Sequence, residues 1–440
     1  MQKNIVIIGG GICGLSAGHF ISKKTEDFII LESQNKLGGI IQTDISNNYI
    51  CENGPNTVLL NNNATEEILH DCGLLDRIIY PSDNNSKNRF VFNNGKITRI
   101  PLTPLQLIKS SLLSFNSKFK LFTEFLVKKH KENDTVFNFI NKRFGKEFHD
   151  KLIVPFITGI YAGNTKNMST KHSLKNLWTL EQKYGSISNG LIRKVLKKNN
   201  QIQSFNFPNG LSELISKIEK GLKDKIRLNS KVSKIEKTKN GYEITFNNQE
   251  KIYCKKIICT VPSYILINLI DDHKLIKELK KVKYNPIDVF HLGLNQKNIN
   301  TNFNGFGILA KPSDNKSYLG VLFNTDTFKH VSPKGKNLYT ILVGGENQSY
   351  LCNKNILEIE DLIIKEIRSL FNYKGEIDFK NNYRWERGIP QYTMNQENLI
   401  KAINNFQLEY NNFYITGNYF GGVSVSDCIK KSYDISLEAI

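Results

Sequence analysis

The stretch Asn4-Ile5-Val6-Ile7-Ile8-Gly9-Gly10-Gly11-Ile12-Cys13-Gly14 decides the fold of this chain. Its first five residues form a β-branched apolar run, which is typical of a buried parallel strand. The glycines that follow have the spacing G-x-G-x-x-G, and apolar residues at helical spacing come next. A second apolar run, Phe28-Ile29-Ile30-Leu31, ends on Glu32. The stretch therefore predicts a β-α-β unit with a glycine-rich first turn.

Each part of this unit has a physical reason in dinucleotide binding. Gly9 permits the tight turn, Gly11 lets the backbone approach a pyrophosphate, and Gly14 lets helix and strand pack closely. The start of the helix offers free N–H groups and a partial positive charge to the phosphates. Glu32 can accept hydrogen bonds from both ribose hydroxyls. We therefore expect an adenine dinucleotide to contact Gly9, Gly10, Gly11, Ile12, Cys13, Gly14 and Glu32.

Two further glycine-rich segments favour FAD over a nicotinamide cofactor. Leu37-Gly38-Gly39 closely follows the acidic residue, where a nicotinamide domain would run on into another helix. Near the C-terminus, the apolar run 413–417 leads into glycines at 421 and 422 and then into an amphipathic helix. A reduced flavin carries negative charge near its N1–C2=O edge, which a second helix start stabilises.

Composition narrows the remaining possibilities. The 440 residues suffice for two or three domains. The seven cysteines include no C-x-x-C pair and the eight histidines no metal-binding spacing, so we expect no disulfide, no metal and a reducing compartment. His149 and His172 are expected on helix surfaces. No signal peptide and no membrane-spanning run is recognised, which predicts a cytoplasmic protein.

The charge balance leaves several partners open. Sixty Lys and Arg against 41 Asp and Glu give a net charge of +19, which suits nucleic acid, an acidic membrane surface or a polycarboxylate substrate. Lysine is also spread through the whole chain, so that solvated surface explains the balance equally well. No nucleic-acid-binding motif is present, and we expect no nucleic acid partner.

The chain order predicts an α/β fold with interwoven domains. A Rossmann-like FAD-binding domain takes residues 1–85, 205–262 and 380–440, and a mixed-sheet substrate domain takes 86–103 and 263–379. Residues 104–204 form a helical subdomain, in which apolar residues alternate with lysines. Such a segment lies in a membrane interface or packs on the protein core, and the sequence favours neither. Peripheral contact with the inner face of the cell membrane is thus one alternative.

Six blocks of sequence carry a resemblance to a known family. The least generic is Val154-Pro155-Phe156-Ile157-Thr158-Gly159-Ile160-Tyr161-Ala162-Gly163-Asn164. Blocks at 37–43, 54–57, 207–211, 388–392 and 417–428 match in the same order. Over nearly its whole length the chain resembles the FAD-dependent protoporphyrinogen oxidases, a branch of the monoamine-oxidase-like flavoproteins.

The resemblance implies roles for individual residues. Val232 would contact the adenine through its backbone, and Arg89 would hold a substrate propionate as a bidentate fork, unless it is an ordinary surface arginine. Ala162 and Gly163 would be small because a flat macrocycle passes close to the flavin, and Leu309, Leu322 and Leu342 would sandwich that macrocycle. The remaining flavin contacts would be Gly38, Gly39, Ile40, Gly54, Pro55, Asn56, Thr57, Gly417, Asn418, Val423, Ser424 and Val425.

The chain departs from the family pattern at three places. Asn164 replaces a common Asp, Ile40 replaces a basic or bulky residue, and Met394-Asn395-Gln396 replaces a frequent Val-Gly-His. These departures concern how the substrate is positioned and leave the cofactor assignment intact.

The implied reaction is oxidation of protoporphyrinogen IX to protoporphyrin IX in haem biosynthesis. Hydride would pass from a ring carbon to flavin N5 in successive two-electron steps, with dioxygen reoxidising the flavin, so no catalytic side chain is expected. The alternatives are the sister reaction on coproporphyrinogen III, another flavin amine oxidase or desaturase, and a non-catalytic flavin-binding or membrane-scaffold protein. The sequence leaves the oligomeric state open, with a homodimer as one alternative.

Overall fold

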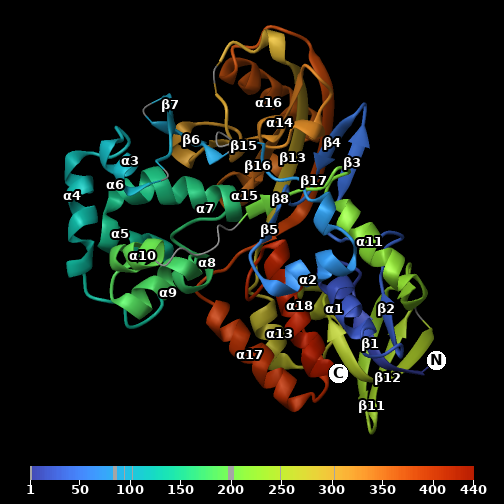
Figure 1. Cartoon of the computed structure of the whole chain (residues 1–440). Helices are drawn as coiled ribbons and strands as arrows, with labels where there is room; N and C mark the ends of the chain where they lie inside the picture. Colours follow the sequence, from blue (N-terminus) through green and yellow to red (C-terminus); the bar gives the residue numbers. More distant parts are fainter. Residues whose placement is uncertain are drawn as a thin grey trace.

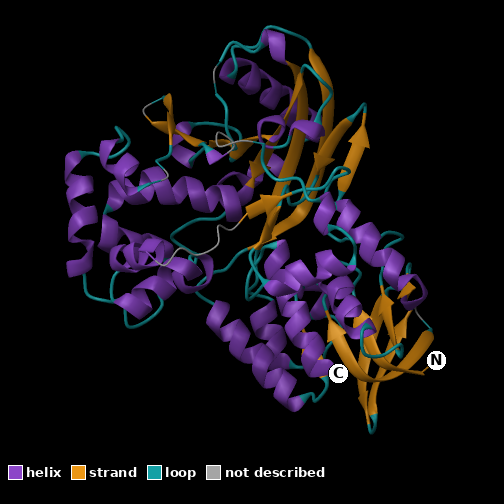
Figure 2. Ribbon diagram, viewed as in Figure 1, coloured by secondary structure: helices purple, strands orange, loops and turns teal. Residues whose placement is uncertain are grey.

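The computed structural model describes residues 2–82, 87–93, 95–101, 103–196, 203–247, 249–301 and 303–440. Two sheets lie one above the other, and a lobe made of helices projects to one side (Figures 1 and 2). The strands β6 (Arg89–Asn93) and β7 (Lys96–Arg99) pair as a hairpin, and Asn94 in its turn lies outside the described residues.

The first sheet is built around β1 (Gln2–Ile8), which lies parallel to β2 (Phe28–Leu31) and to β12 (Glu250–Cys259). Side chains of β1 alternate between two cores, with Ile5 and Ile7 in one and Val6 and Ile8 in the other. Both faces of the sheet are therefore covered, as in doubly wound folds. Further strands are β9 (Ile226–Arg227), β10 (Val232–Thr238), β11 (Gly241–Phe246) and β18 (Phe413–Ile415).

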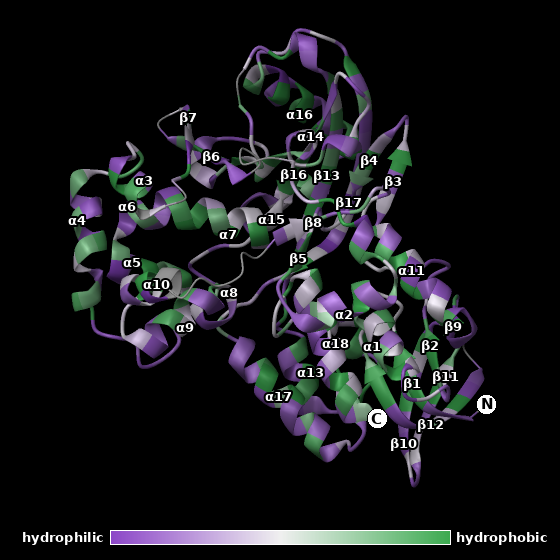
Figure 3. Cartoon of the chain, in the orientation of Figure 1, coloured by the Kyte–Doolittle hydropathy of each residue, from purple (hydrophilic) through white to green (hydrophobic). Residues whose placement is uncertain are grey.

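Helices from distant parts of the chain cover these two faces (Figure 1). Much of β1 is hydrophobic, as a strand between two cores requires (Figure 3). One face carries α1 (Ile12–Ser22), α2 (Asn63–Asp71), α11 (Ser212–Leu222) and α18 (Val425–Ala439). The other carries α12 (Ser263–Leu266), α13 (His273–Leu279) and α17 (Gln396–Glu409).

The second sheet has the order β17-β13-β16-β15-β14-β6-β7 and is antiparallel except where β14 meets β6. One of its faces packs against α16 (Ile356–Leu370) through the buried side chains of Ile359, Ile363 and Ile367. Its other strands are β13 (Tyr284–Asn295), β14 (Gly307–Leu309), β15 (Gly320–Phe323), β16 (Lys336–Gly344) and β17 (Ile377–Pro390).

Two of the expected domain boundaries move. Residues 263–279 pack on the first sheet through Leu266, Leu275 and Leu279, and not with the second sheet. The strand β17 runs across residue 380 and pairs with β13 as far as Pro390. Hydrophobic periodicity identifies both segments as structured, but it does not say which sheet receives their apolar faces.

The side lobe comprises residues 103–196, and all the regular elements assigned within it are helices. None of the described helices is long and apolar enough to cross a membrane. A buried arginine, Arg143, bonds the carboxylates of Glu124 and Glu181 at its centre. His149 is buried and not on a helix surface, because its ring contacts the Asp150 carboxylate and the Thr165 hydroxyl. The longer helices of the lobe are α4 (Phe115–Thr123), α5 (Val136–Phe144), α7 (Val154–Tyr161), α9 (Lys175–Tyr184) and α10 (Ile187–Leu196).

A buried carboxylate ties the start of α11 to a hairpin next to the second sheet. Glu52 ends β4 (Tyr49–Glu52), which pairs with β3 (Thr43–Ser46). Its Oε1 accepts a hydrogen bond from the Leu211 amide at 2.7 Å, and its Oε2 accepts one from the Thr43 hydroxyl at 2.8 Å. Burial nevertheless raises the pKa of Glu52 to about 7.

This carboxyl group predicts a pH-dependent stability. Because the folded state holds the Glu52 proton more tightly than the unfolded state, in which the pKa is 4.5, stability falls as pH rises from 4.5 to about 7. The loss is about 3 kcal/mol for a shift of this size. We expect denaturant unfolding of Glu52→Gln to lack this component. A difference between wild type and variant that stays constant across this pH range would contradict the assignment.

Candidate functional site

The predicted β-α-β turn has the geometry that its glycines require. Gly9 has φ +107°, and a Cβ on Gly14 would lie 1.9 Å from the Gly9 carbonyl oxygen. The Gly10 amide donates to Glu32 Oε2 at 2.6 Å, which holds the acidic residue beside the turn. The helix α1 starts after Gly11 without a side-chain cap and without an acidic residue in its first turn. Its first turn is therefore free to bind an anion.

A second glycine segment lies directly against this turn. The Gly38 amide donates to the Gly10 carbonyl at 2.9 Å, and Gly38 and Gly11 form a parallel bridge. A Cβ on Gly39 would lie 3.3 Å from Gly11 Cα, and one on Gly54 would lie 1.9 Å from the Ile40 carbonyl oxygen. The structure thus brings 9–14, 38–40 and 54–57 together, as the motifs predict.

The C-terminal glycine loop comes to the same place. The helix α18 packs along α1, where Ser436 donates to the Ala17 carbonyl at 3.3 Å (Figure 1). Its start is fixed by a capping box between Ser424 and Asp427. The Tyr392 hydroxyl donates to the Asn418 carbonyl at 2.8 Å and accepts from the Gly422 amide at 3.0 Å. Residues 417–425 are therefore held against the N-terminal unit.

The segment before Val232 runs beside the acidic residue. The Ser230 amide donates to the Glu32 carbonyl at 2.7 Å, and the Asn229 amide donates to the Gln34 carbonyl at 2.9 Å. Val232 itself begins β10 and is buried. An acid, an uncapped helix start and glycine-lined backbone in this order fit the ribose and pyrophosphate of an extended dinucleotide.

The three predicted substrate leucines share one face of the second sheet. Leu309 and Leu342 are the register partners of Gly320 on its two sides. Leu322 lies two residues further along the same strand, opposite Thr340, and therefore on the same face. All three are half-buried, whereas Ile308, Val321 and Ile341 on the opposite face are buried. The sheet therefore presents an apolar floor, the leucine face, away from α16.

Arg89 lies at the edge of this same face. It pairs with Gly307 in the row that contains Leu322. Its guanidinium stacks 4.6 Å from the centre of the Phe306 ring and donates to the Lys87 carbonyl at 3.0 Å. Partial desolvation lowers its pKa, but an arginine stays charged at neutral pH. No carboxylate pairs with Arg89 in the described ranges.

Ala162 packs beside Leu342 of the leucine face, whereas the near neighbours of Gly163 are Gln391 and Met168. Ala162 ends α7 with φ +50° and shares a small core with Val289 and Leu342. A Cβ on Gly163 would lie 2.5 Å from both Gln391 Oε1 and Met168 Sδ. A side chain at 163 would therefore displace Gln391 or Met168, which is a reason for its small size independent of any bound ring.

A polar junction that the motifs did not predict ties the hairpin β3–β4 to the second sheet at Asn53, the residue after β4. The Trp385 indole N–H donates to the Asn53 carbonyl at 2.7 Å, and Asn53 Nδ2 donates to Asp44 at 2.7 Å. Asn53 Oδ1 consequently faces His291, so that Nε2 of this histidine carries the hydrogen and donates at 3.3 Å. Complete burial lowers the pKa of His291 to about 4, and the ring is neutral.

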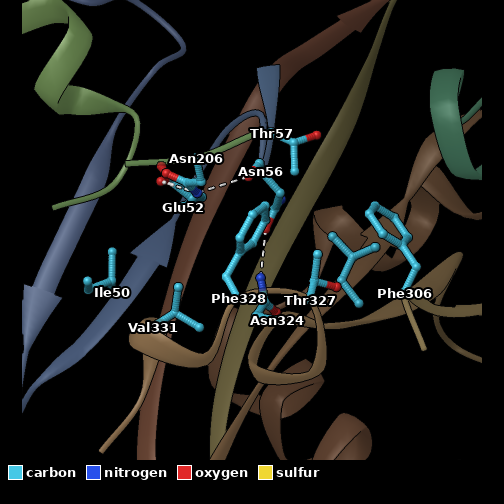
Figure 4. A pocket seen from close by; sticks show the side chains of 11 residues that line it. Ile50, Glu52, Asn56, Thr57, Asn206, Phe306, Asn324, Thr327, Phe328 and Val331 are labelled. Atoms are coloured by element: carbon cyan, nitrogen blue, oxygen red, sulfur yellow. Dashed lines mark hydrogen bonds between the residues drawn. The ribbon is translucent and has the colours of Figure 1, made fainter. Parts of the chain in front are cut away.

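A small cavity of about 10 Å³, roughly the room of one water molecule, lies next to this junction, between the segment 52–57 and residues of the second sheet. Its lining includes Asn56 and Thr57 of the segment 54–57, which we name the flavin loop after the contact expected of it, and Phe306 (Figure 4). Leu322 of the leucine face also lines it. Asn324 Nδ2 reaches across and donates to Asn56 Oδ1 at 2.9 Å. The segment 54–57 thus faces the leucine face directly. In the sequence, the one feature that points to this junction is that Asn53 directly precedes the motif at 54–57.

Comparison with known proteins agrees with this geometry. The model of the flavin containing amine oxidoreductases matches residues 12–434. The chain is 27% identical to protoporphyrinogen oxidase 2 of Arabidopsis thaliana, over 97% of this chain and 92% of that protein. It is 25% identical to coproporphyrinogen III oxidase of Bacillus subtilis (strain 168), over 97% and 96%.

Solved structures share the fold. The crystal structure of a protein from Exiguobacterium sp. 255-15 superposes with a TM-score of 0.86 at 21% identity, covering 99% of this chain and 98% of that one. A putrescine oxidase with bound putrescine superposes with a TM-score of 0.72 at 14% identity, covering 100% and 99%. The chain belongs to the flavin containing amine oxidoreductase family, and its cofactor is FAD.

Proposed function

We propose that this protein is an oxygen-dependent protoporphyrinogen IX oxidase. The observation that carries the proposal is the position of Arg89, which lies in the same strand row as Leu322 at the border of the leucine face. Leu322 and the flavin loop 54–57 line the same cavity. No carboxylate pairs with Arg89 among the described residues. An apolar floor with a cation at its edge suits a flat macrocycle that carries propionates on its rim. Relatives at about a quarter identity carry the names of the two porphyrinogen oxidases.

The same residues that the sequence motifs identified would hold FAD. Glu32 would bind the ribose, the first turn of α1 the pyrophosphate, and Val232 the adenine. The start of α18, with Val423, Ser424 and Val425, would face the electron-rich edge of the isoalloxazine. The remaining flavin contacts would come from the flavin loop (Gly54, Pro55, Asn56 and Thr57) and from Ile40, Gly417 and Asn418.

FAD supplies the hydride acceptor in such a reaction. The protein residues then have three tasks: Arg89 orients the ring through its carboxylates, the leucine face excludes water, and the junction at Asn53 fixes the distance between floor and flavin loop. Dioxygen would be the final electron acceptor. Neither the leucine face nor the flavin loop carries an acid–base pair, which agrees with a substrate that becomes aromatic on oxidation.

One observation favours coproporphyrinogen III as the alternative substrate. A surface cavity of about 310 Å³ lies beside Gly163 and Asn164 and is lined by Lys146 and Lys166. Neither lysine pairs with a carboxylate in the described part of the chain. Two cations beside Gly163, in a cavity that the Asp150 carboxylate also lines, would suit a substrate with additional propionates.

A direct comparison of the two porphyrinogens tests the proposal. We expect the holoenzyme to produce fluorescent porphyrin faster from protoporphyrinogen IX than from coproporphyrinogen III at equal, subsaturating concentrations. The measurement is the ratio of kcat/KM values, with free FAD in place of the enzyme as the control for autoxidation. A ratio that favours coproporphyrinogen III would transfer the function to the alternative, and no turnover of either would refute both.

Arg89 is tested by truncation. Arg89→Ala should raise KM about 10- to 100-fold, because a charge-assisted hydrogen bond contributes roughly 1.5 to 3 kcal/mol. Arg99→Ala serves as the matched control, since Arg99 is an exposed arginine on the neighbouring strand β7. Unchanged kinetics in Arg89→Ala with FAD fully bound would remove Arg89 from the substrate site.

We also propose that the helical lobe binds a membrane surface. The helix α4 and the turn after it expose Phe115, Phe119, Phe122, Phe125 and Leu126, with Phe115 at 82% relative exposure. Lys118, Lys120 and Lys128 stand among them. Exposed aromatic residues edged by lysine are typical of helices that lie in an anionic lipid interface.

Sedimentation with lipid vesicles checks this surface. We expect the protein to bind vesicles that contain anionic lipid. The double variant Phe119→Glu/Phe122→Glu should bind at least about tenfold more weakly, because each substitution removes an apolar side chain from the lipid and adds a negative charge that the anionic lipid repels. Leu408→Glu is the control, since Leu408 is also an exposed apolar residue, at 78% relative exposure, and lies on α17, outside the lobe. Equal binding by both variants would contradict the assignment of this face.

A further inference from the structure

A lysine of α18 reaches back to the C-terminal glycine loop. The Lys431 ammonium donates hydrogen bonds to the carbonyl oxygens of Gly417, Phe420 and Gly422, the last at 3.0 Å. An ammonium has three protons to donate, so these three bonds use all of them. The whole hydrogen-bonding capacity of Lys431 is therefore directed to the backbone of the loop.

The shape of the loop and the side chain of Lys431 depend on one another. Gly421 and Gly422 have φ angles of +70° and +127°, which turn the backbone so that the carbonyls converge. A Cβ on Gly421 would lie 3.0 Å from Lys431 Cδ. Carbonyl oxygens that are turned away from water need a donor, and Lys431 provides it for three of them.

The charge of Lys431 is not neutralised by an ion pair. Its Nζ bonds no carboxylate within the ranges that the structure describes, and the carboxylate of Asp427, one turn earlier, is engaged by Ser424. The neighbouring Lys430 behaves differently, because its Nζ forms an i,i+4 ion pair with Asp434 on the exposed side of the helix. Two adjacent lysines of one helix therefore have opposite surroundings.

We propose that Lys431 is a positioning residue of the flavin site, which clamps loop 417–422 and places a positive charge behind it. This inference rests on the FAD assignment and on the role proposed for residues 417–425, but not on the identity of the substrate. A reduced flavin holds more negative charge than an oxidised one, and a fixed cation in a partly buried site stabilises that charge. Lys431 consequently raises the reduction potential of the bound flavin.

Three substitutions separate the clamp from the charge. Lys431→Gln keeps hydrogen-bond donors and loses the charge, Lys431→Met loses both, and Lys431→Arg keeps both. We expect a more negative midpoint potential in Lys431→Met and Lys431→Gln, measured by stepwise reduction against a reference dye, and a potential like that of wild type in Lys431→Arg. FAD should dissociate about tenfold more readily from Lys431→Met, which lacks all three charge-assisted bonds.

Lys430→Met is the matched control, because it removes one positive charge from the same helix without touching the loop. Its potential and FAD affinity should equal those of wild type. Equal potentials in Lys431→Met, Lys431→Gln and wild type would overturn the proposal, as would an equal negative shift in Lys430→Met. If Lys431→Met loses FAD altogether, the comparison of Lys431→Gln with Lys431→Arg still decides. The potential is measured without substrate, so that failure of the porphyrinogen assay leaves this test unaffected.

Discussion

The close approach of backbone at the first turn is the constraint on which the rest of the structure depends. A Cβ at Gly14 would overlap the Gly9 carbonyl, and a Cβ at Gly54 would overlap the Ile40 carbonyl. Because these glycines have no side chain, the segments 9–14, 38–40 and 54–57 can approach one another closely at the end of β1. The packing of α18 along α1 then adds the C-terminal loop to the same place. The site is thus made by backbone, and side chains only complete it.

The junction at Asn53 extends this constraint to the second sheet. Asn53 uses its carbonyl, its amide and both side-chain atoms in bonds to Trp385, Gln42, His291 and Asp44. A neutral His291 suits this place, since an imidazolium there would be buried without a carboxylate partner. Directional bonds therefore connect the residue before the flavin loop to the second sheet, which carries the leucine face.

Local sequence patterns predicted the parts of the site that lie on single elements. The β-α-β unit follows from apolar runs and glycine spacing, and Leu309, Leu322 and Leu342 were identified through the family resemblance before their common face was visible. The strand register explains that face, because equal alternation on three strands aligns residues 309, 322 and 342. The junction at Asn53 and the Lys431 clamp were not predicted. Both consist of common hydrogen bonds between polar groups, and a sequence pattern does not predict which distant backbone or side-chain group becomes the partner.

The large positive net charge of the chain, +19, does not by itself indicate which cations lie at the site. Most lysines of the described surface either form ion pairs, as Lys430 does with Asp434, or extend into solvent. Arg89 and Lys431 direct their charge at uncharged groups, Arg89 at an aromatic ring and a carbonyl and Lys431 at three carbonyls. Arg387, over the Tyr264 ring, is a further cation of this kind. A cation without a carboxylate partner keeps its full attraction for an anion that arrives later. The charges that the two proposals use are therefore those of Arg89 and Lys431, and they depend on how each side chain is partnered rather than on the net charge.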